Sequence, residues 1–487
     1  MAMADADAAD KAVAAAAYHQ PDNDATHSII KQLLLQPRTL SQLLGLQTIN
    51  LLKSGLIHSW DNELGLLAML YVAFDCKMYL WTMDEVTFSY IVFLLAFLPC
   101  VLYPITIFFF CISLVYERIK LHRKVDPTVF LTELPGVSIV KPLMGVDPFL
   151  EVNLESHFLM NYPKFELLIG IQDEEDPAIN LVNKLRERYP KVDCRLFLGG
   201  KDGVMNPMVN NMALPYENAK YDLVWISSSR VKASTDIILD MVAKIQNPRV
   251  AIVHQIPFVT DQKGLAAAIE KVYFGASAAR YYLAFNAVGI NCMTGMSYLI
   301  DKVELDRVNG LAWFGRYLAE DFFLSKTLHE KGFRHQVAAI PAQQNVGTCS
   351  IVGYKDRMVR WTRLRLNMMP FTTVCLEPFS ESIPLGIYMA WAVNHFFDIS
   401  PYAVFFTHWA AWCIFDYLQV KGVQNGPLPF GKLTYLTAWL IRECLWIWGY
   451  CEAILNPRRV TWGKRTYRLS KYGESLEIVS DKSVLPI

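Results

Sequence analysis

One uninterrupted apolar stretch constrains this chain more than any other feature. From Phe88 to Val115 the sequence FSYIVFLLAFLPCVLYPITIFFFCISLV contains no charged side chain. A helix of this length spans about 40 Å at ~1.5 Å per residue, more than the ~30 Å hydrocarbon core of a bilayer requires. A buried helix of a soluble domain rarely needs such a run. The stretch therefore predicts a transmembrane helix over residues 88–116, which Pro99 and Pro104 could kink.

Charge is distributed unequally around this stretch. Asp84 and Glu85 precede it, and a basic cluster follows it, consisting of Arg118, Lys120, His122, Arg123 and Lys124. Positive charge favours the cytosolic side of a membrane. We therefore expect residues 117–370, which follow the helix, to form a cytosolic domain.

A second apolar region predicts C-terminal membrane-embedded helices and a tail over residues 371–487. Its three hydrophobic stretches are Ile383–Phe397, Tyr402–Val420 and Leu433–Leu455. They contain ionisable residues, namely His395, His408, Asp416, Arg442, Glu443 and Glu452. An ionisable group at bilayer depth costs about 2.5–3.5 kcal/mol, so these groups should pair, face a polar cavity or reach the headgroups from an interfacial bundle. The number of C-terminal spans stays open.

The N-terminal part has a different character. Ala and Asp dominate its beginning, and no basic segment precedes a short apolar core, so a cleaved signal peptide is not expected. The segment Leu64–Trp81 is apolar enough for a membrane-surface or second spanning helix, but Asp75 and Lys77 interrupt it. We predict that residues 1–87 form a partly disordered N-terminal extension.

Composition excludes two classes of function. The 46 basic side chains balance the 46 acidic ones, so no overall positive field indicates a nucleic-acid partner. The 10 cysteines include no CxxC pair, and several lie within apolar runs. This pattern argues against a zinc site or a disulfide framework and favours a reducing compartment.

The middle of the chain alternates between strand-like and helix-like segments. The expected strands are Val137–Val140, Phe165–Ile171, Cys194–Leu198, Asp222–Ser227 and Arg249–Val253. Helical stretches are expected near 148–161, 176–189, 233–245 and 262–280. Repeated βα units predict an α/β domain with a mostly parallel sheet, whose ligands bind beyond the carboxyl ends of the strands.

Two acidic groups could act at such a site. Asp173 is the first acid after the second strand, in LLIGIQDEEDPA, and the acids behind it could instead cap the helix that starts near Pro177. Glu320 and Asp321 open a predicted helix in YLAEDFFLSKTL. An acid pair at a helix start is often structural, so a catalytic role for this pair needs further support.

A basic motif and a histidine complete the candidates. Arg357 and Arg360 are three residues apart and share a helix face, followed directly by Trp361. Guanidinium groups bind phosphate oxygens bidentately, which suits a diphosphate leaving group, and Trp361 could cover a sugar or brace the arginines. The alternative is a basic helix that meets anionic lipid headgroups. His254, at the end of AIVHQIP, is a lone histidine with either a structural or a site role.

Taken together, these stretches resemble the ceramide glucosyltransferases. The matching segments cover roughly residues 88–470 and include LPGVSIVKPLMGVDP, NYPKFELLIGIQDEEDPA, KYDLVWI, VYFGASAARYY, TGMSYLI, YLAEDFFLSKTL, RMVRWTRLRLNMMP and FDYLQVKGVQ. The resemblance implies a GT-A nucleotide-sugar fold with three signature aspartates and a (Q/R)xxRW motif. Asp321 matches the third aspartate and is the implied catalytic base. The implied substrate-binding residues are Asp173 (the first aspartate), His254, Glu320, Arg357, Arg360 and Trp361.

Two residues depart from the family's pattern. The family's second aspartate follows a strand in a WICDSG-like stretch, whereas this chain has WISSSR, with Ser228 at that position. The family's NPK reads NPM here, with Met208 in place of the lysine. A hydroxyl is a weaker ligand for a hard cation than a carboxylate. Either a divalent metal (Mg or Mn) is held through Asp173 and water, with Arg230 or Lys232 supplying charge, or catalysis is weakened.

The resemblance implies transfer of glucose from UDP-glucose to the primary hydroxyl of ceramide, with inversion, to give β-glucosylceramide. It further implies a multi-pass Golgi membrane protein whose catalytic domain faces the cytosol. The expected partners are the donor, the acceptor and the bilayer, without nucleic acid, and a homo-oligomer stays open. One alternative is a weakened or non-catalytic relative that binds lipid or regulates an active partner. Another is a processive polysaccharide synthase, which would need a channel of more helices than the C-terminal segments supply.

Overall fold

The protein is described from a computed structural model, which places residues 85–126, 133–260, 263–345, 349–462, 465–470 and 473–481. The expectations for residues 1–84 of the N-terminal extension and for Leu64–Trp81 lie outside the described residues, whereas residues 85–87 belong to a helix. Residues from Glu85 onward form one compact unit.

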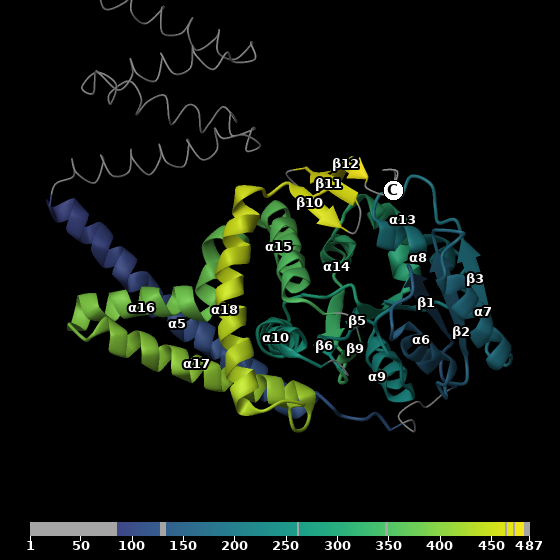
Figure 1. Cartoon of the computed structure of the whole chain (residues 1–487), viewed down its shortest axis with the longest axis horizontal. Helices are drawn as coiled ribbons and strands as arrows, with labels where there is room; N and C mark the ends of the chain where they lie inside the picture. The colour runs from purple at the N-terminus through teal and green to yellow at the C-terminus, as the bar shows by residue number, and fades with distance from the viewer. Residues whose placement is uncertain are drawn as a thin grey trace, which may run out of the picture. The chain divides into compact units, whose positions relative to one another are not determined.

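A seven-stranded sheet forms the centre of this unit, with the strand order β3-β2-β1-β4-β7-β5-β8 (Figure 1). The strands are β1 Val137–Leu143, β2 Phe165–Ile171, β3 Cys194–Leu198, β4 Leu223–Ser227, β5 Val250–His254, β7 Ser297–Asp301 and β8 Arg334–Val337. Only β7 runs antiparallel to its neighbours β4 and β5. The predicted mostly parallel α/β sheet is therefore confirmed. All five strands expected from the sequence are present, while β7 and β8 were not predicted.

Helices cover both faces of the sheet because its strands are apolar on both sides. On one face lie α6 Leu150–Phe158, α7 Ala178–Arg188 and α9 Thr235–Ile245. On the other lie α8 Pro207–Glu217, α13 Gly310–Trp313 and α14 Glu320–Glu330, with the shorter α12 Lys302–Asp306 and η3 Phe314–Arg316 beside them. The sequence pattern missed α8, which begins where Asn206 accepts hydrogen bonds from the backbone N–H groups of Met208 and Val209.

Helix α5, Glu85–Lys120, is the one helix among the described residues that is long and apolar enough to cross a bilayer. It continues through Pro99 and Pro104, and large apolar side chains such as Phe93 and Phe108 are exposed along it. The C-terminal stretches form helices too: α16 Ser382–Phe397, α17 Pro401–Gln424 and α18 Lys432–Leu455. Their insertion into a membrane stays a prediction.

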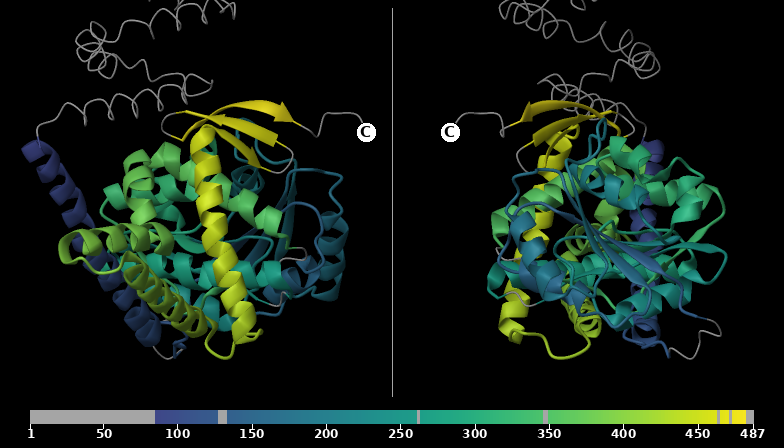
Figure 2. Two further views of the ribbon diagram at one scale, coloured as in Figure 1. Left: turned by 60° about the vertical axis from the view of Figure 1, so that its left-hand side comes forward. Right: turned by 90° about the vertical axis from the view of Figure 1, so that its right-hand side faces the viewer.

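The remaining elements connect these parts. Helices α10 Leu265–Tyr273 and α15 Ile351–Met368 lie between the sheet and the C-terminal helices (Figure 1), and α11 Ala279–Val288 packs against α5. The short helices here are the π-helices η2 Phe274–Ala278 and η4 Thr372–Leu376 and the 3-10 helix η5 Glu377–Ser380. A two-stranded sheet pairs β6 Pro257–Val259 with β9 Ala342–Gln344. After α18, a three-stranded sheet is formed by β10 Arg459–Trp462, β11 Arg465–Leu469 and β12 Ser475–Asp481 (Figure 2).

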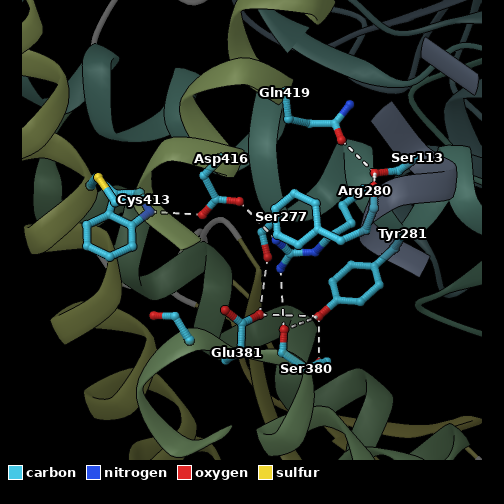
Figure 3. A network of polar contacts seen from close by, with 12 residues as sticks. Ser113, Ser277, Arg280, Tyr281, Ser380, Glu381, Cys413, Asp416 and Gln419 are labelled. Atoms are coloured by element: carbon cyan, nitrogen blue, oxygen red, sulfur yellow. Dashed lines mark hydrogen bonds and ion pairs between the residues drawn. The ribbon is translucent and has the colours of Figure 1, made fainter. Parts of the chain in front are cut away.

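Buried ion pairs tie the C-terminal helices to the α/β domain (Figure 3). Arg280 of α11 pairs with Asp416 of α17 at 2.9 Å, and its guanidinium lies over the rings of Phe110 in α5 and Trp412 in α17. A second group of ion pairs joins Arg442 to Glu381 and Glu443. The ionisable residues expected to pair within the C-terminal helices do so at Asp416, Arg442 and Glu443.

Candidate active site

Several candidate residues meet at the carboxyl edge of the sheet. Asp173 follows the end of β2, Ser228 follows β4, and His254 is the last residue of β5. Because β7 is antiparallel to β4 and pairs Ser297 with Ser227, the segment just before β7 lies at this same edge. That segment contains Gly295, which contacts the first turn of α14.

The acid pair at the start of α14 has two distinct environments. Asp321 Oδ2 accepts a hydrogen bond from the Gly295 backbone N–H at 2.6 Å, and its Oδ1 accepts one from Phe322 N–H at 2.8 Å. Glu320 is buried and accepts a hydrogen bond from Asn206 Nδ2 at 2.8 Å. Asn206 therefore links the cap of α8 to the acid pair, a role that its sequence context did not reveal.

Burial raises the pKa of both carboxyl groups. For Glu320, burial and the charge of Asp321 raise the pKa to about 8, so this group keeps its proton at neutral pH. At Asp321 the two backbone N–H donors oppose the effect of burial on the pKa, because they stabilise the ionised form. The arrangement favours Asp321 as the ionised member of the pair.

The two motif arginines lie together in a pocket of about 570 Å³. Arg357 and Arg360 line it from α15, and Arg230 lines it from the turn after β4. Arg357 also forms an ion pair with Glu270 of α10. Burial and the nearby charges of Arg357 and Arg230 lower the pKa of Arg360 to about 10. Positive charge is therefore concentrated at this pocket.

Trp361 contacts an arginine of this pocket and packs against an apolar cluster near the start of α14. Its ring is 5.8 Å from the Arg357 guanidinium and packs beside Phe274 of η2. It also shares an apolar cluster with Phe322, the residue after Asp321. Asp321 itself does not line the arginine pocket. The structure thus brings Arg357 and Arg360 together and places Asp321 in an adjoining region.

His254 lies inside the protein rather than at a surface. Its side chain is buried, neither ring nitrogen has a side-chain or backbone hydrogen-bond partner of good geometry in the described part of the chain, and the Tyr282 ring lies 5.7 Å away. Burial lowers the pKa of this imidazole to about 4, so it is neutral at physiological pH. It does not line the arginine pocket.

The acidic loop after β2 serves partly as a helix cap. Asp176 is buried and accepts hydrogen bonds from the backbone N–H groups of Ala178, in α7, and Gly145. Asp173 is exposed, and its Oδ1 accepts a hydrogen bond from Glu175 N–H at 3.0 Å. The alternative of a helix-capping role therefore holds for Asp176. The Asp173 carboxylate remains available to bind a ligand.

The donor set for a divalent metal is sparse. Within the described ranges, no three His, Cys, Asp or Glu side chains gather in a way that could hold a metal ion. Ser228, which the family resemblance assigns to the second-aspartate position, has a buried Oγ with no hydrogen-bond partner among the residues that the structure describes. Asp173 and the other carboxylates near this edge form no such group of three in the described ranges, so the residues present do not fit a cation site built from protein ligands alone.

The structure also shows the environment of Met208. Met208 packs against the apolar cluster beneath α8 and α14, so the residue that replaces the family's lysine is part of the core. A second pocket, of about 760 Å³, is formed by the basic end of α5 and the end of α17. None of the candidate residues lines that pocket.

Comparison with known proteins identifies the family. The profile of glycosyl transferase family 21 matches residues 105–475. The chain belongs to this family. It is 36% identical over 377 residues to ceramide glucosyltransferase 3 of Caenorhabditis elegans, which covers 76% of this chain and 81% of that protein. The resemblance to ceramide glucosyltransferases is therefore confirmed.

More distant relatives of this family 21 chain occur in fungi. The ceramide glucosyltransferase of Komagataella phaffii is 26% identical over 426 residues, which covers 69% of this chain and 83% of that protein. Among solved structures, a mannosyltransferase of Pyrobaculum calidifontis in complex with GDP-Man and Mn²⁺ covers 75% of this chain and 99% of its own, with a TM-score of 0.48 at 15% identity.

Proposed function

We propose that this family 21 protein is a GT-A-type ceramide glucosyltransferase that moves glucose from UDP-glucose to the primary hydroxyl of ceramide. The ceramide glucosyltransferases among its relatives support the reaction. The observation that carries the proposal is the pocket lined by Arg357 and Arg360, together with Trp361, which lies beside Arg357 and packs against the same apolar cluster as Phe322, the residue after Asp321. Such an arrangement suits a donor whose sugar extends from a diphosphate toward a base.

Asp321 is the proposed general base. Its carboxylate takes the proton of the ceramide hydroxyl while that oxygen attacks the anomeric carbon of glucose. The bond from the anomeric carbon to the diphosphate breaks, and UDP leaves from the opposite face. A single displacement of this kind converts an α-linked donor into a β-glucoside.

The arginines are proposed to hold the leaving group. Guanidinium forks bind phosphate oxygens bidentately and meet the negative charge that develops as UDP departs. Trp361 would cover the sugar from the pocket side. Glu320 and His254, both buried, would shape the substrate site from behind rather than carry charge to it. Asp173 is the proposed ligand if a divalent ion accompanies the donor.

The membrane segments are proposed to hold the site at a bilayer surface. Helix α5 would span the membrane, and α16 to α18 would contact it, so that the chains of ceramide stay embedded during transfer. A multi-pass Golgi location with the catalytic domain in the cytosol is part of the proposal, supported by the family resemblance and by the basic end of α5.

The decisive experiment supplies the purified full chain, in lipid, with UDP-glucose and ceramide. The expected product carries one β-linked glucose on the lipid. A long glycan would instead indicate a processive polysaccharide synthase. If neither product formed, the chain would be a non-catalytic relative, the candidate favoured by Ser228 and Met208 at two of the family's polar positions.

A further inference from the structure

A buried lysine anchors the turn that follows β4. Lys141 of β1 is fully buried, and its Nζ donates hydrogen bonds to the carbonyl oxygens of Ser228 at 2.8 Å and Val231 at 3.0 Å. The Nζ also contacts His157 Nε2 at 3.3 Å. No carboxylate pairs with this lysine in the described part of the chain, so the two carbonyl groups are its main acceptors. The hydrogen bonds from this one buried amine fix both ends of the turn.

The two carbonyl groups between these ends are held as well. Asn153 Nδ2 lies 3.4 Å from the carbonyl oxygen of Ser229, and the backbone N–H of Asn345 donates to that of Arg230 at 2.8 Å. Asn153 also donates to the Asn345 carbonyl at 3.1 Å, which joins the two supports. Every carbonyl of the turn from 228 to 231 thus has a donor. The backbone of Arg230 is fixed, and its side chain is presented from a rigid turn.

That side chain lines the arginine pocket and forms no close ion pair with any residue that the structure describes. Arg230, Arg357 and Arg360 all line the pocket, and Glu270 pairs with Arg357. In the described part of the chain, no carboxylate lies within ion-pairing distance of Arg230 or Arg360. The other acids that line the pocket already have basic partners: Glu452 pairs with Lys355 and Arg363, and Asp356 with Lys355.

Like charges held this close repel one another. The pKa of Arg230 is lowered by burial and by Arg357, against a smaller opposing effect of Asp147 and Glu270, and the pKa of Arg360 is lowered by burial, Arg357 and Arg230. Repulsion between fixed cations is relieved by an anion that bears several charges and contacts all of them. Phosphate oxygens have this chemistry. Because the turn continues β4 at the carboxyl edge of the sheet, the pocket adjoins the region where ligands of parallel α/β sheets bind.

We infer that Arg230 is a third guanidinium that binds the diphosphate of the sugar donor, and that this binding does not require a divalent ion. The inference rests on the proposed function, since it presumes a nucleotide-sugar donor. It also accounts for a chain that has a serine at position 228 and a fixed arginine two residues later. In this arrangement the guanidinium of Arg230 neutralises the diphosphate. A metal ion held by a carboxylate would otherwise have this role.

The test measures UDP binding to the full chain in detergent or nanodiscs, by calorimetry, with EDTA present throughout. We expect wild type to bind UDP and Arg230→Gln to bind it about tenfold to a hundredfold more weakly, the usual range for one hydrogen-bonded charge. Arg230→Lys keeps the charge but loses the bidentate fork, and its affinity should lie between the two. Arg186→Gln, which removes an exposed arginine on α7, is the matched control and should leave UDP affinity unchanged.

A second variant tests the anchor rather than the ligand. Lys141→Met leaves Arg230 in the sequence but frees the carbonyl groups of Ser228 and Val231. If the turn presents Arg230, this variant should also weaken UDP binding, and adding Arg230→Gln to it should cost less than Arg230→Gln costs in wild type. Thermal unfolding of each variant identifies any that fail to fold. If a variant fails to fold, the UDP affinity of Arg230→Lys is measured in its place.

The possible outcomes distinguish failure of the inference about Arg230 from failure of the proposed function. Equal UDP affinity in wild type and Arg230→Gln would overturn the inference, as would loss of wild-type binding in EDTA that Mn²⁺ restores. Failure of wild type to bind UDP under any condition would instead refute the proposed function. If Arg230→Gln bound UDP normally but bound phosphatidylserine vesicles less than wild type, the pocket would serve lipid headgroups and the inference would be wrong.

Discussion

At the scale of single residues, chemistry is divided between two neighbouring carboxyl groups. Glu320 is buried and accepts a hydrogen bond from an asparagine, and its pKa is raised to about 8. Asp321 receives two backbone hydrogen bonds and is partly exposed. Two adjacent acids with such different surroundings can take different roles, one neutral and structural, the other ionised and basic.

Replacement of Asp321 by Asn keeps the shape of the side chain and removes the base. We expect turnover of ceramide to fall by about 10²–10⁴-fold, the usual contribution of a general base. UDP affinity should stay near that of wild type, because Asp321 does not line the arginine pocket. Initial rates and calorimetry check both parts, and retained turnover would refute the assignment of the base.

The raised pKa of Asp321 has a consequence for the pH profile. The base works in its ionised form, so activity should be lost as the pH falls through the pKa of this group. Since burial raises that pKa above the ordinary value of 3.8, the acidic limb of kcat/KM should lie at higher pH than that of a free aspartate. A profile that stays flat down to about pH 4 would contradict this expectation.

Position 228 offers a test of metal use. Ser228→Asp restores a carboxylate at the edge that holds Asp173, and two carboxylates bind a hard cation better than one. We expect this variant to respond to added Mn²⁺ more strongly than wild type does. Rates measured across a Mn²⁺ titration check this, with Ser234→Asp, at the start of α9, as a control that adds the same charge elsewhere. An unchanged metal response would place the donor away from residue 228.

At the scale of elements, the site depends on helices that bring distant segments together. Helix α15 carries the two motif arginines, and α14 carries the acid pair. Trp361 of α15 packs against both regions, so the register of α15 sets the separation between them. The buried pair of Arg280 (Figure 3) and the buried pairs of Arg442 then fix α11, α17 and α18 around this assembly.

This buried network predicts a large effect on stability. Arg280→Met would leave the Asp416 carboxylate buried with Trp439 Nε1 as its remaining hydrogen-bond partner. Removal of one member of a buried ion pair usually costs about 3–5 kcal/mol of folding free energy, so the midpoint of thermal unfolding should fall by several degrees. Glu330→Gln, which breaks an exposed pair with Lys326, should shift it little.

The double variant Arg280→Met with Asp416→Leu sharpens this prediction. Because it removes both charges, it should be less destabilised than Arg280→Met alone. Thermal unfolding of the detergent-solubilised chain measures all of these variants. A double variant that unfolds below the single one would show that the pair acts through its hydrogen bonds to other groups rather than through the ion pair.

At the scale of the whole molecule, the orientation in the membrane follows from α5. Its acidic start and basic end predict that the α/β domain lies on the cytosolic side. In sealed microsomes, a membrane-impermeant maleimide should label Glu187→Cys on exposed α7 above the wild-type background without detergent. Glu85→Cys, at the other end of α5, should be labelled only after permeabilisation. The reverse pattern would invert the proposed topology.

The sequence by itself predicted most of the helices and strands and the charged residues proposed for the site. The uncharged run of α5, the apolar strands and the paired arginines are local patterns, and a period of two or of 3.6 residues is enough to read them. Sequence similarity likewise identified the family. The local sequence pattern missed β7 and α8, since a strand antiparallel to its neighbours and a helix that begins at an asparagine cap have weak local signals.

Only the tertiary structure decided which charges share a space. Arg230 is separated from Arg357 by more than a hundred residues, so nothing local to either one reveals that both line one pocket. The isolation of His254 and the anchoring of the 228–231 turn by Lys141 are likewise products of packing. Burial and electrostatic repulsion depend on distances through space, and those are fixed when the sheet and helices close around the site.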